Sequence, residues 1–260
     1  MVLRSLQDCR RILANVISGA RVAVVGGSFI AMEAAASLLG RGLSVDVIAP
    51  EEHPLEKVFG RELSDLVLQA HAQKGVRLHL RSKVARIDDK QILLQGGKQI
   101  EADIVVVGVG VEPRLQLAEA AGLTLDRGVQ VNSRLQTSDP DIFAAGDIAR
   151  WPDPHIGERI RVEHWVVAER QGQIAAANML GRDEPFTMTR FFWTKHFDLS
   201  IRYVGHAETW DETRVEGDPA HRNCLVRFRR EGRDLAVATV ERDKESLRAQ
   251  SAMEGETRRT

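Results

Sequence analysis

The chain is poor in cysteine and in net charge, and both scarcities exclude classes of protein. Its 260 residues include two cysteines, Cys9 and Cys224, too far apart in sequence to suggest a redox pair or a metal cluster. The 36 basic and 37 acidic residues nearly cancel, so there is no global field to attract nucleic acid or an anionic membrane. No apolar stretch is long enough to span a bilayer, and Met1 is not followed by a signal-peptide pattern. We expect a cytoplasmic protein with no nucleic-acid or membrane partner.

Apolar runs and helical spacings alternate along the chain, which favours an α/β fold. The hydrophobic share of 43% and the length allow two domains, or one large domain, with a buried core. The last residues, 250–260, are charged and lack periodicity, so we expect disorder there. The predicted helices cover 5–13, 29–40, 60–74, 115–122 and 163–180. The predicted strands cover 22–25, 45–48, 76–80, 85–88, 91–94, 100–102, 104–107, 142–145, 190–204, 224–229 and 235–240.

A Gly-rich turn joins the first predicted strand to the next helix. Gly26 suits a tight turn, Ser28 stands where a dinucleotide fingerprint has a glycine, and Ala31 takes the last glycine position. Such a turn places a pyrophosphate on the N-terminus of a helix. An ordinary strand–turn–helix joint is the alternative.

A second pattern spans residues 137–148, where a polar turn and a short apolar strand lead into Gly146 and Asp147. A carboxylate at the end of such a strand lies at the ligand edge of a parallel sheet, where Asp147 can accept a hydrogen bond from a ribityl hydroxyl. The alternative is that Asp147 caps the next helix.

With three further motifs, these patterns resemble the FAD- and NAD(P)-dependent pyridine nucleotide oxidoreductases, which have two dinucleotide-binding domains. The further motifs are residues 108–114 (GVGVEPR), residues 162–165 (VEHW) with Ala168 and Gly172, and residues 192–195 (FWTK) followed by 203–205 (YVG). The likeness is greatest to the branch of apoptosis-inducing-factor-like proteins and ferredoxin or rubredoxin reductases.

The resemblance implies a Rossmann-like NAD-binding domain over residues 1–114, part of an FAD-binding domain over 115–182, and a small C-terminal α+β domain over 183–260. About twenty residues precede the first strand, and they contain no second Gly-rich turn. We therefore expect the chain to be a piece that lacks the N-terminal FAD half, and to be inactive by itself.

Specific roles follow from the resemblance. Glu33, in the first turn of its helix, would bind the nicotinamide carboxamide, and Glu51 would bind the adenosine ribose. Because no arginine directly follows the second strand, NADH is favoured over NADPH. A surface acid is the alternative for each glutamate. Gly108 and Gly110 would let backbone approach the nicotinamide, with a simple turn as the alternative.

The helix that opens at His164 and Trp165 would face the flavin with its free N–H groups, while Trp193 would lie beside the isoalloxazine. Core packing is the alternative for Trp193 and for the neighbouring Phe191 and Phe192. No side chain is assigned to catalysis or to a metal. The expected cofactor contacts are Gly26, Gly27, Ser28, Phe29, Ile30, Glu33, Glu51, Gly108, Val109, Gly110, Gly146, Asp147, Glu163, His164, Trp165, Ala168 and Trp193.

The implied function is electron transfer from NADH through FAD to an iron–sulfur carrier such as a ferredoxin, rubredoxin or Rieske protein. A homodimer is a further expected partner arrangement. One alternative is a disulfide, coenzyme A disulfide or oxygen reductase of the same superfamily, although the chain has no Cys-x-x-Cys and no His-Pro-Thr segment. Another is a nucleotide-sensing interaction protein of the apoptosis-inducing-factor kind, which near-neutrality disfavours.

Overall fold

The computed structural model describes residues 1–257, which form two compact units. Unit 1 contains Met1–Gly110 together with Trp193–Ile201 and Gly217–Cys224. Unit 2 contains the rest of the described chain. No helix in the described part is long and apolar enough to cross a membrane.

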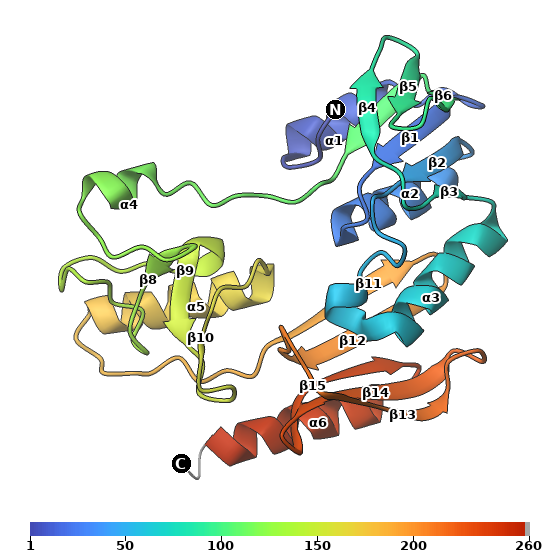
Figure 1. Cartoon of the computed structure of the whole chain (residues 1–260). Coiled ribbons are helices and arrows are strands. Elements are labelled where there is room, and N and C mark those ends of the chain that lie inside the picture. The colour runs from blue at the N-terminus through green and yellow to red at the C-terminus, as the bar shows by residue number, and fades with distance from the viewer. Residues whose placement is uncertain (258–260) are drawn as a thin grey trace. The chain divides into compact units, whose positions relative to one another are not determined.

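Unit 1 is built on a four-stranded parallel sheet in the order β3-β2-β1-β7 (Figure 1). Its strands are β1 (Arg21–Val25), β2 (Ser44–Ile48), β3 (Arg77–His79) and β7 (Ile104–Val107). Val25 lies opposite both Ile48 and Val107, so three strands end at the same edge. This edge is where ligands bind in open parallel sheets.

Three helices belong to unit 1: α1 (Leu6–Ala14), α2 (Phe29–Leu39) and α3 (Glu56–Lys74). The prediction for the third was short by four residues, because the chain turns helical before Gly60 and kinks there with φ 67°. The predicted end at residue 74 is confirmed, since Gly75 ends α3 in the left-handed conformation.

A second, antiparallel sheet of unit 1 has the order β4-β5-β6. It consists of β4 (Val84–Ile87), β5 (Gln91–Leu94) and β6 (Gln99–Glu101). Buried apolar side chains join this sheet to β1 and β2, and they are Ala23, Ile48, Ile92, Leu94, Ile100 and Ala102.

Unit 2 begins with α4 (Gln116–Ala120) and a small sheet that packs near the long helix α5 (Trp165–Met179) (Figure 1). The sheet has the order β10-β9-β8. Its strands are β8 (Val129–Gln130), β9 (Ala149–Pro152) and β10 (Arg159–Ile160).

The predicted strand at 142–145 is wrong. Phe143 makes only an isolated bridge with Gln136, and Gly146–Ile148 forms a short 3-10 helix, η1. Phe143, Ala144 and Ala145 pack against the apolar cluster around the buried Trp151. These apolar side chains therefore contribute to the core although their backbone is not part of a β-sheet.

A five-stranded sheet follows in the order β11-β12-β15-β14-β13. Its strands are β11 (Phe191–His196), β12 (Leu199–Gly205), β13 (Glu212–Asp218), β14 (Asn223–Arg230) and β15 (Arg233–Val240). The predicted strand 190–204 is in fact two strands, because the backbone turns at Phe197 with φ 59°. Glu231 and Gly232, both with positive φ, form the turn that joins β14 to β15.

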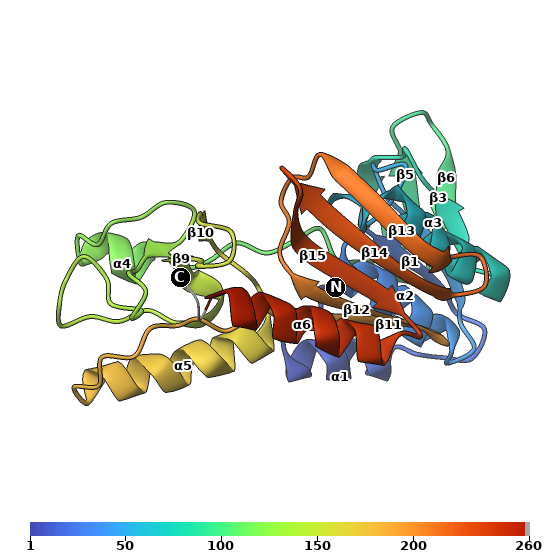
Figure 2. The ribbon, with the colours of Figure 1, turned by 90° about the horizontal axis from the view of Figure 1, so that it is seen from below.

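The expectation of disorder over residues 250–260 is wrong for residues 250–257, which belong to helix α6 (Asp243–Thr257); residues 258–260 lie outside the described part. Figure 2 shows α6 lying along the sheet that contains β15. Met253, only 7% exposed, packs with Val204, Leu225 and Val237. Ala249 of the same helix packs against this cluster as well. So few apolar contacts among charged residues leave little periodicity in the sequence.

Candidate dinucleotide-binding sites

The Gly-rich turn of unit 1 brings the ends of β1 and β7 into close contact. Gly26 has φ +121°, and a Cβ built on it would lie 2.8 Å from the carbonyl carbon of Gly108 and nearer still to its oxygen. The two ends are also hydrogen-bonded, since Gly108 N donates to Val25 O at 2.8 Å. Gly26 N donates to Ile48 O, at the end of β2, at 2.8 Å. Only glycine fits at position 26, on grounds of both torsion and space.

Ser28 is the N-cap of α2, which explains why a serine can stand in the turn. Its hydroxyl accepts from Ala31 N at 3.3 Å and donates to Gly108 O at 2.7 Å. Ala31 also needs to be small, because a Cβ on Gly108 would lie 3.1 Å from the Cβ of Ala31. The first N–H groups of α2, from Phe29 and Ile30 onward, thus start directly beside the Gly-rich turn, as pyrophosphate binding requires.

Glu51 lies against this turn although it is two positions beyond the end of its strand. A Cβ on Gly27 would be 3.0 Å from Glu51 Oε2. The pairing of β2 with β3 also brings Arg81 to this edge, where its backbone N–H donates to Glu51 O at 3.2 Å. Sequence reasoning missed this arginine because it follows a different strand.

The guanidinium of Arg81 is paired with Glu52. The hydrogen bond from Arg81 lowers the pKa of the Glu52 carboxyl. Glu52, the acid next to Glu51, therefore pairs with the guanidinium of Arg81.

Glu33 is the fifth residue of α2, so the expectation that it lies in the first turn is wrong. It is partly exposed and accepts a hydrogen bond from the hydroxyl of Thr194. It also lines a cavity of about 370 Å³ between α1 and α2. The cavity is lined by Leu3, Cys9, Ile12, Leu13, Ile30, Glu33, Ala34, Ser37, Leu38, Arg41 and Val106.

Beyond β7 the backbone is open. Val109 is 71% exposed, and Gly110 has φ +106° with space around it. The main chain at Gly110 is therefore open to the approach of a ligand.

In unit 2, Gly146 and Asp147 lie in η1, which packs on α5. Gly146 has φ +82°, its N–H donates to Gln171 Oε1 at 2.8 Å, and its added Cβ would meet Ala168 Cβ at 3.2 Å. Gln171 is fully buried and was missed by sequence reasoning. The element after η1 is β9, so Asp147 does not begin a helix, and the capping alternative is wrong in that form.

Helix α5 starts at Trp165, two residues later than the predicted start at residue 163. Its N-cap residue, His164, makes no side-chain cap hydrogen bond. Burial lowers the pKa of His164, an effect that the nearby Asp147 charge opposes. Arg161 links the two segments, because its guanidinium donates to Glu163 Oε1 at 2.8 Å and to Asp147 O at 2.9 Å. Trp165 is 61% exposed.

The aromatic residues at the start of β11 differ in their surroundings. Trp193 is 48% exposed and is not a core residue. Phe192 stacks on the buried Tyr203, with ring centroids 5.1 Å apart, and also contacts His164 at 5.7 Å. Core packing thus describes Phe192 better than Trp193.

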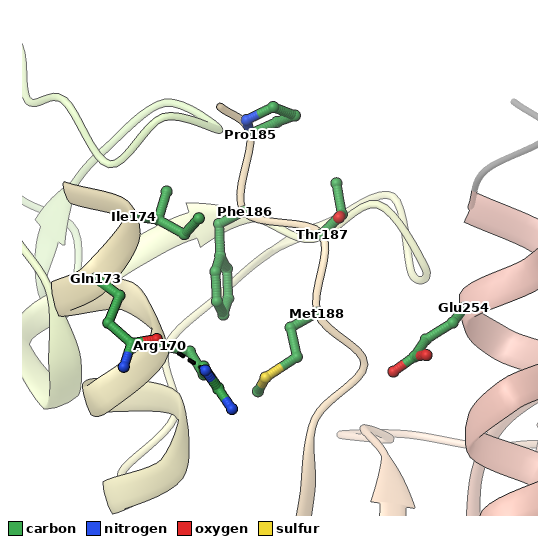
Figure 3. Close-up of a pocket in the computed structure, with 8 residues that line it drawn as sticks. All are labelled: Arg170, Gln173, Ile174, Pro185, Phe186, Thr187, Met188 and Glu254. Atoms are coloured by element: carbon green, nitrogen blue, oxygen red, sulfur yellow. Dashed lines mark hydrogen bonds between the residues drawn. The ribbon is translucent and has the colours of Figure 1, made fainter. Parts of the chain in front are cut away.

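Figure 3 shows another cavity of unit 2, of about 520 Å³, between α5, the segment around Phe186 and Glu254 of α6. The described residues that line it are Arg170, Gln173, Ile174, Pro185, Phe186, Thr187, Met188 and Glu254, and none is a predicted cofactor contact.

The observed geometry fits a dinucleotide in unit 1. The glycine-only contact of Gly26 with Gly108, the N-terminus of α2 and the acid at Glu51 are of the kind that can hold a pyrophosphate and a ribose. In unit 2, Gly146 and the uncapped N-terminus of α5 offer close backbone approach and N–H donors of the kind that a flavin accepts.

Residues 1–172 match the family described as pyridine nucleotide-disulphide oxidoreductase, and residues 191–260 match the reductase C-terminal family. The chain belongs to the pyridine nucleotide-disulphide oxidoreductases. This confirms the resemblance, the α/β class and the oxidoreductase class.

Three similar proteins illustrate the match. The ferredoxin–NAD(+) reductase component of the anthranilate 1,2-dioxygenase system of Burkholderia cepacia is 35% identical over 92% of this chain and 60% of its own length. Apoptosis-inducing factor 3 of Homo sapiens is 30% identical over 93% of this chain and 41% of its own. The crystal structure of the covalent putidaredoxin reductase–putidaredoxin complex aligns with a TM-score of 0.92 and 30% identity over 98% of this chain and 63% of that one. This chain spans about three fifths of the length of the first of these relatives.

Proposed function

We propose that the protein is a reductase that takes electrons from NADH through FAD to an iron–sulfur carrier of the ferredoxin, rubredoxin or Rieske type. The observation that carries the proposal is the contact of Gly26 with Gly108, which only glycine permits and which leaves the N-terminus of α2 open to a pyrophosphate. The proposed domains are residues 1–114 for NAD, 115–182 for part of the FAD site and 183–260 for the C-terminal reductase domain.

Within the NAD domain each candidate residue has one task. The backbone of the turn and the N–H groups of α2 bind the pyrophosphate, and Glu51 accepts hydrogen bonds from the adenosine ribose. Glu33 accepts from the nicotinamide carboxamide, and the main chain at Gly108 and Gly110 lies along the ring. Orientation is the protein's contribution, so no side-chain acid or base is assigned.

For the flavin, Asp147 is the proposed partner of a ribityl hydroxyl, and the N–H groups that open α5 are proposed to face negative charge on the ring. Trp193 is proposed to cover the ring, which is consistent with its exposure of 48%. When bound, FAD supplies the acceptance of a hydride and the release of single electrons.

The names of relatives support the choice of acceptor. One is a ferredoxin–NAD(+) reductase component, and another was crystallised with putidaredoxin. The alternatives are a disulfide, coenzyme A disulfide or oxygen reductase, and an interaction protein like apoptosis-inducing factor 3, which is also a relative. A cytoplasmic location and a homodimer complete the proposal; both cysteines are free, which fits a reducing compartment.

Two measurements test this function. Calorimetric titration of the 260-residue chain with NADH and NADPH should give saturable binding that is tighter for NADH. The flavin step is tested on protein loaded with FAD and kept without oxygen, which NADH should bleach and which should then reduce a ferredoxin. If the reduced protein transferred electrons to disulfides but not to ferredoxin, the disulfide alternative would replace the proposal.

A further inference from the structure

We propose that Thr194 is a positioning residue that orients the carboxylate of Glu33 and so makes the nicotinamide subsite select a carboxamide over a carboxylate. The inference rests on the proposed function of Glu33. Its basis is a chain of three side chains from α2 and β11, all within unit 1.

The direction of the hydrogen bonds follows from what each group can donate. An ionised carboxylate only accepts, so the hydroxyl proton of Thr194 points to Glu33 Oε1. Thr194 Oγ1 also lies 3.1 Å from His196 Nε2. Since the only hydroxyl proton is already used, the imidazole must be the donor in that contact.

His196 is suited to be a neutral donor. It is fully buried, and burial together with the neighbouring His71 lowers its pKa to about 3. A neutral ring with its proton on Nε2 leaves Nδ1 bare, and Nδ1 is buried with no hydrogen-bond partner among the described residues. The ring is held by an edge contact with His71, with centroids 5.2 Å apart.

This arrangement leaves one carboxylate oxygen of Glu33 able to accept a hydrogen bond from a ligand. Oε1 accepts a hydrogen bond from a threonine that is 1% exposed, while none of the described residues donates a hydrogen bond to the other carboxylate oxygen of this partly exposed side chain. A carboxamide N–H₂ can donate to that oxygen. A carboxylate in the same place offers no donor and repels Glu33, so a fixed Glu33 discriminates between the two groups.

The test compares NAD⁺ with nicotinic acid adenine dinucleotide, which differs only in having a carboxylate for the carboxamide. Calorimetry gives the two dissociation constants for the 260-residue chain and its variants. Thr194→Val keeps the shape but removes the hydroxyl, and it should lower the preference for NAD⁺ about tenfold. Thr194→Ser, which keeps the hydroxyl, should keep the preference for NAD⁺ at the wild-type level. In a Glu33→Gln background, Thr194→Val should change the preference no further, because the two residues act as a unit.

A purely structural tether would give a different pattern. If the wild-type chain binds NAD⁺ and Thr194→Val lowers only the free energy of unfolding, with the preference intact, Thr194 does not orient Glu33. If the wild-type chain does not bind NAD⁺, the proposed function fails, and this inference fails with it.

An independent readout needs no ligand. Nitrogen-15 spectra of the histidine side chains should show His196 neutral with its proton on Nε2, and Thr194→Val should shift that signal. A proton on Nδ1 would reverse the hydrogen-bond chain and overturn the inference.

Discussion

Gly26 and Gly108 approach so closely that a Cβ on Gly26 would lie 2.8 Å from the carbonyl carbon of Gly108. Real Cβ atoms do not come this near to backbone atoms, so the first βα turn can pack this closely against the end of β7 only with glycine at position 26. The same turn leads directly into the N-terminus of α2, which Ser28 caps. A substitution at Gly26 should therefore affect stability and nucleotide binding together.

Gly26→Ala should lower the free energy of unfolding by about 3 kcal/mol or more, because it combines left-handed strain with overlap of the backbone. Gly42 is the matched control in the same unit, since it has φ +84° but nothing within 4 Å of an added Cβ. Gly42→Ala should cost only the strain, about 1–2 kcal/mol. Urea unfolding measures both, and equal losses would mean that the turn relaxes around the new side chain.

The second prediction concerns the choice between NADH and NADPH. Glu51 Oε2 lies beside Gly27, and the neighbouring Arg81 is engaged by Glu52. Glu51→Gln should weaken NADH binding, since a carboxylate that accepts from ribose hydroxyls is lost. Glu52→Gln should instead leave NADH binding unchanged and tighten NADPH binding several-fold, because Arg81 is released toward a 2′-phosphate. Calorimetric titration distinguishes the two, and an unchanged NADPH constant in Glu52→Gln would show that Arg81 does not reach the site.

A buried ion pair of unit 2 gives the third prediction. Asp153 is 1% exposed and Arg190 is 4% exposed, and burial lowers the pKa of the guanidinium while the Asp153 charge opposes that shift. Asp153→Asn leaves a buried charge without its partner, so we expect a loss of about 3–5 kcal/mol in the free energy of unfolding. The exposed pair of Arg134 and Asp183 is the control, with side chains 42% and 77% exposed. Asp183→Asn should change the stability little, and equal effects would mean that water reaches Arg190.

Short sequence motifs predicted those parts of the candidate site that are formed by residues close together in the sequence. The motifs are the Gly-rich turn, the helix after it and the glycines after β7. In each of them the glycines and their spacing, which can be read from the sequence, indicate the backbone conformation. Glu51 was chosen for its separation in sequence from the Gly-rich turn, and in the structure it lies beside Gly27. The roles of these residues in binding stay predictions.

Long-range partners were not predictable in the same way. Thr194 is 161 positions from Glu33, and only the packing of β11 near α2 brings them together. Arg81 reaches Glu51 through the pairing of β2 with β3. The apolar run at 142–145 was misread as a strand because burial in a cluster and burial in a sheet give the same composition.

The last prediction is a dependence of stability on pH that comes from His196. Its pKa is lowered from 6.5 to about 3 in the folded protein. Below pH 6.5 the unfolded chain binds a proton that the folded chain does not. The stabilisation is therefore complete above pH 6.5 and is lost as the pH falls toward 3.

One such group changes the free energy of unfolding by about 1.4 kcal/mol per pH unit within that window. His164 and His206, whose pKa values burial also lowers, add to the slope of the wild-type chain. Urea unfolding of the wild-type chain and of His196→Gln, from neutral pH down to about pH 4, isolates the share of His196 as the difference between the two slopes. We expect the variant to be less stable than the wild type at neutral pH and to have the shallower slope. Parallel slopes would mean that His196 takes up a proton in the folded protein, which would also remove it as the neutral donor to Thr194.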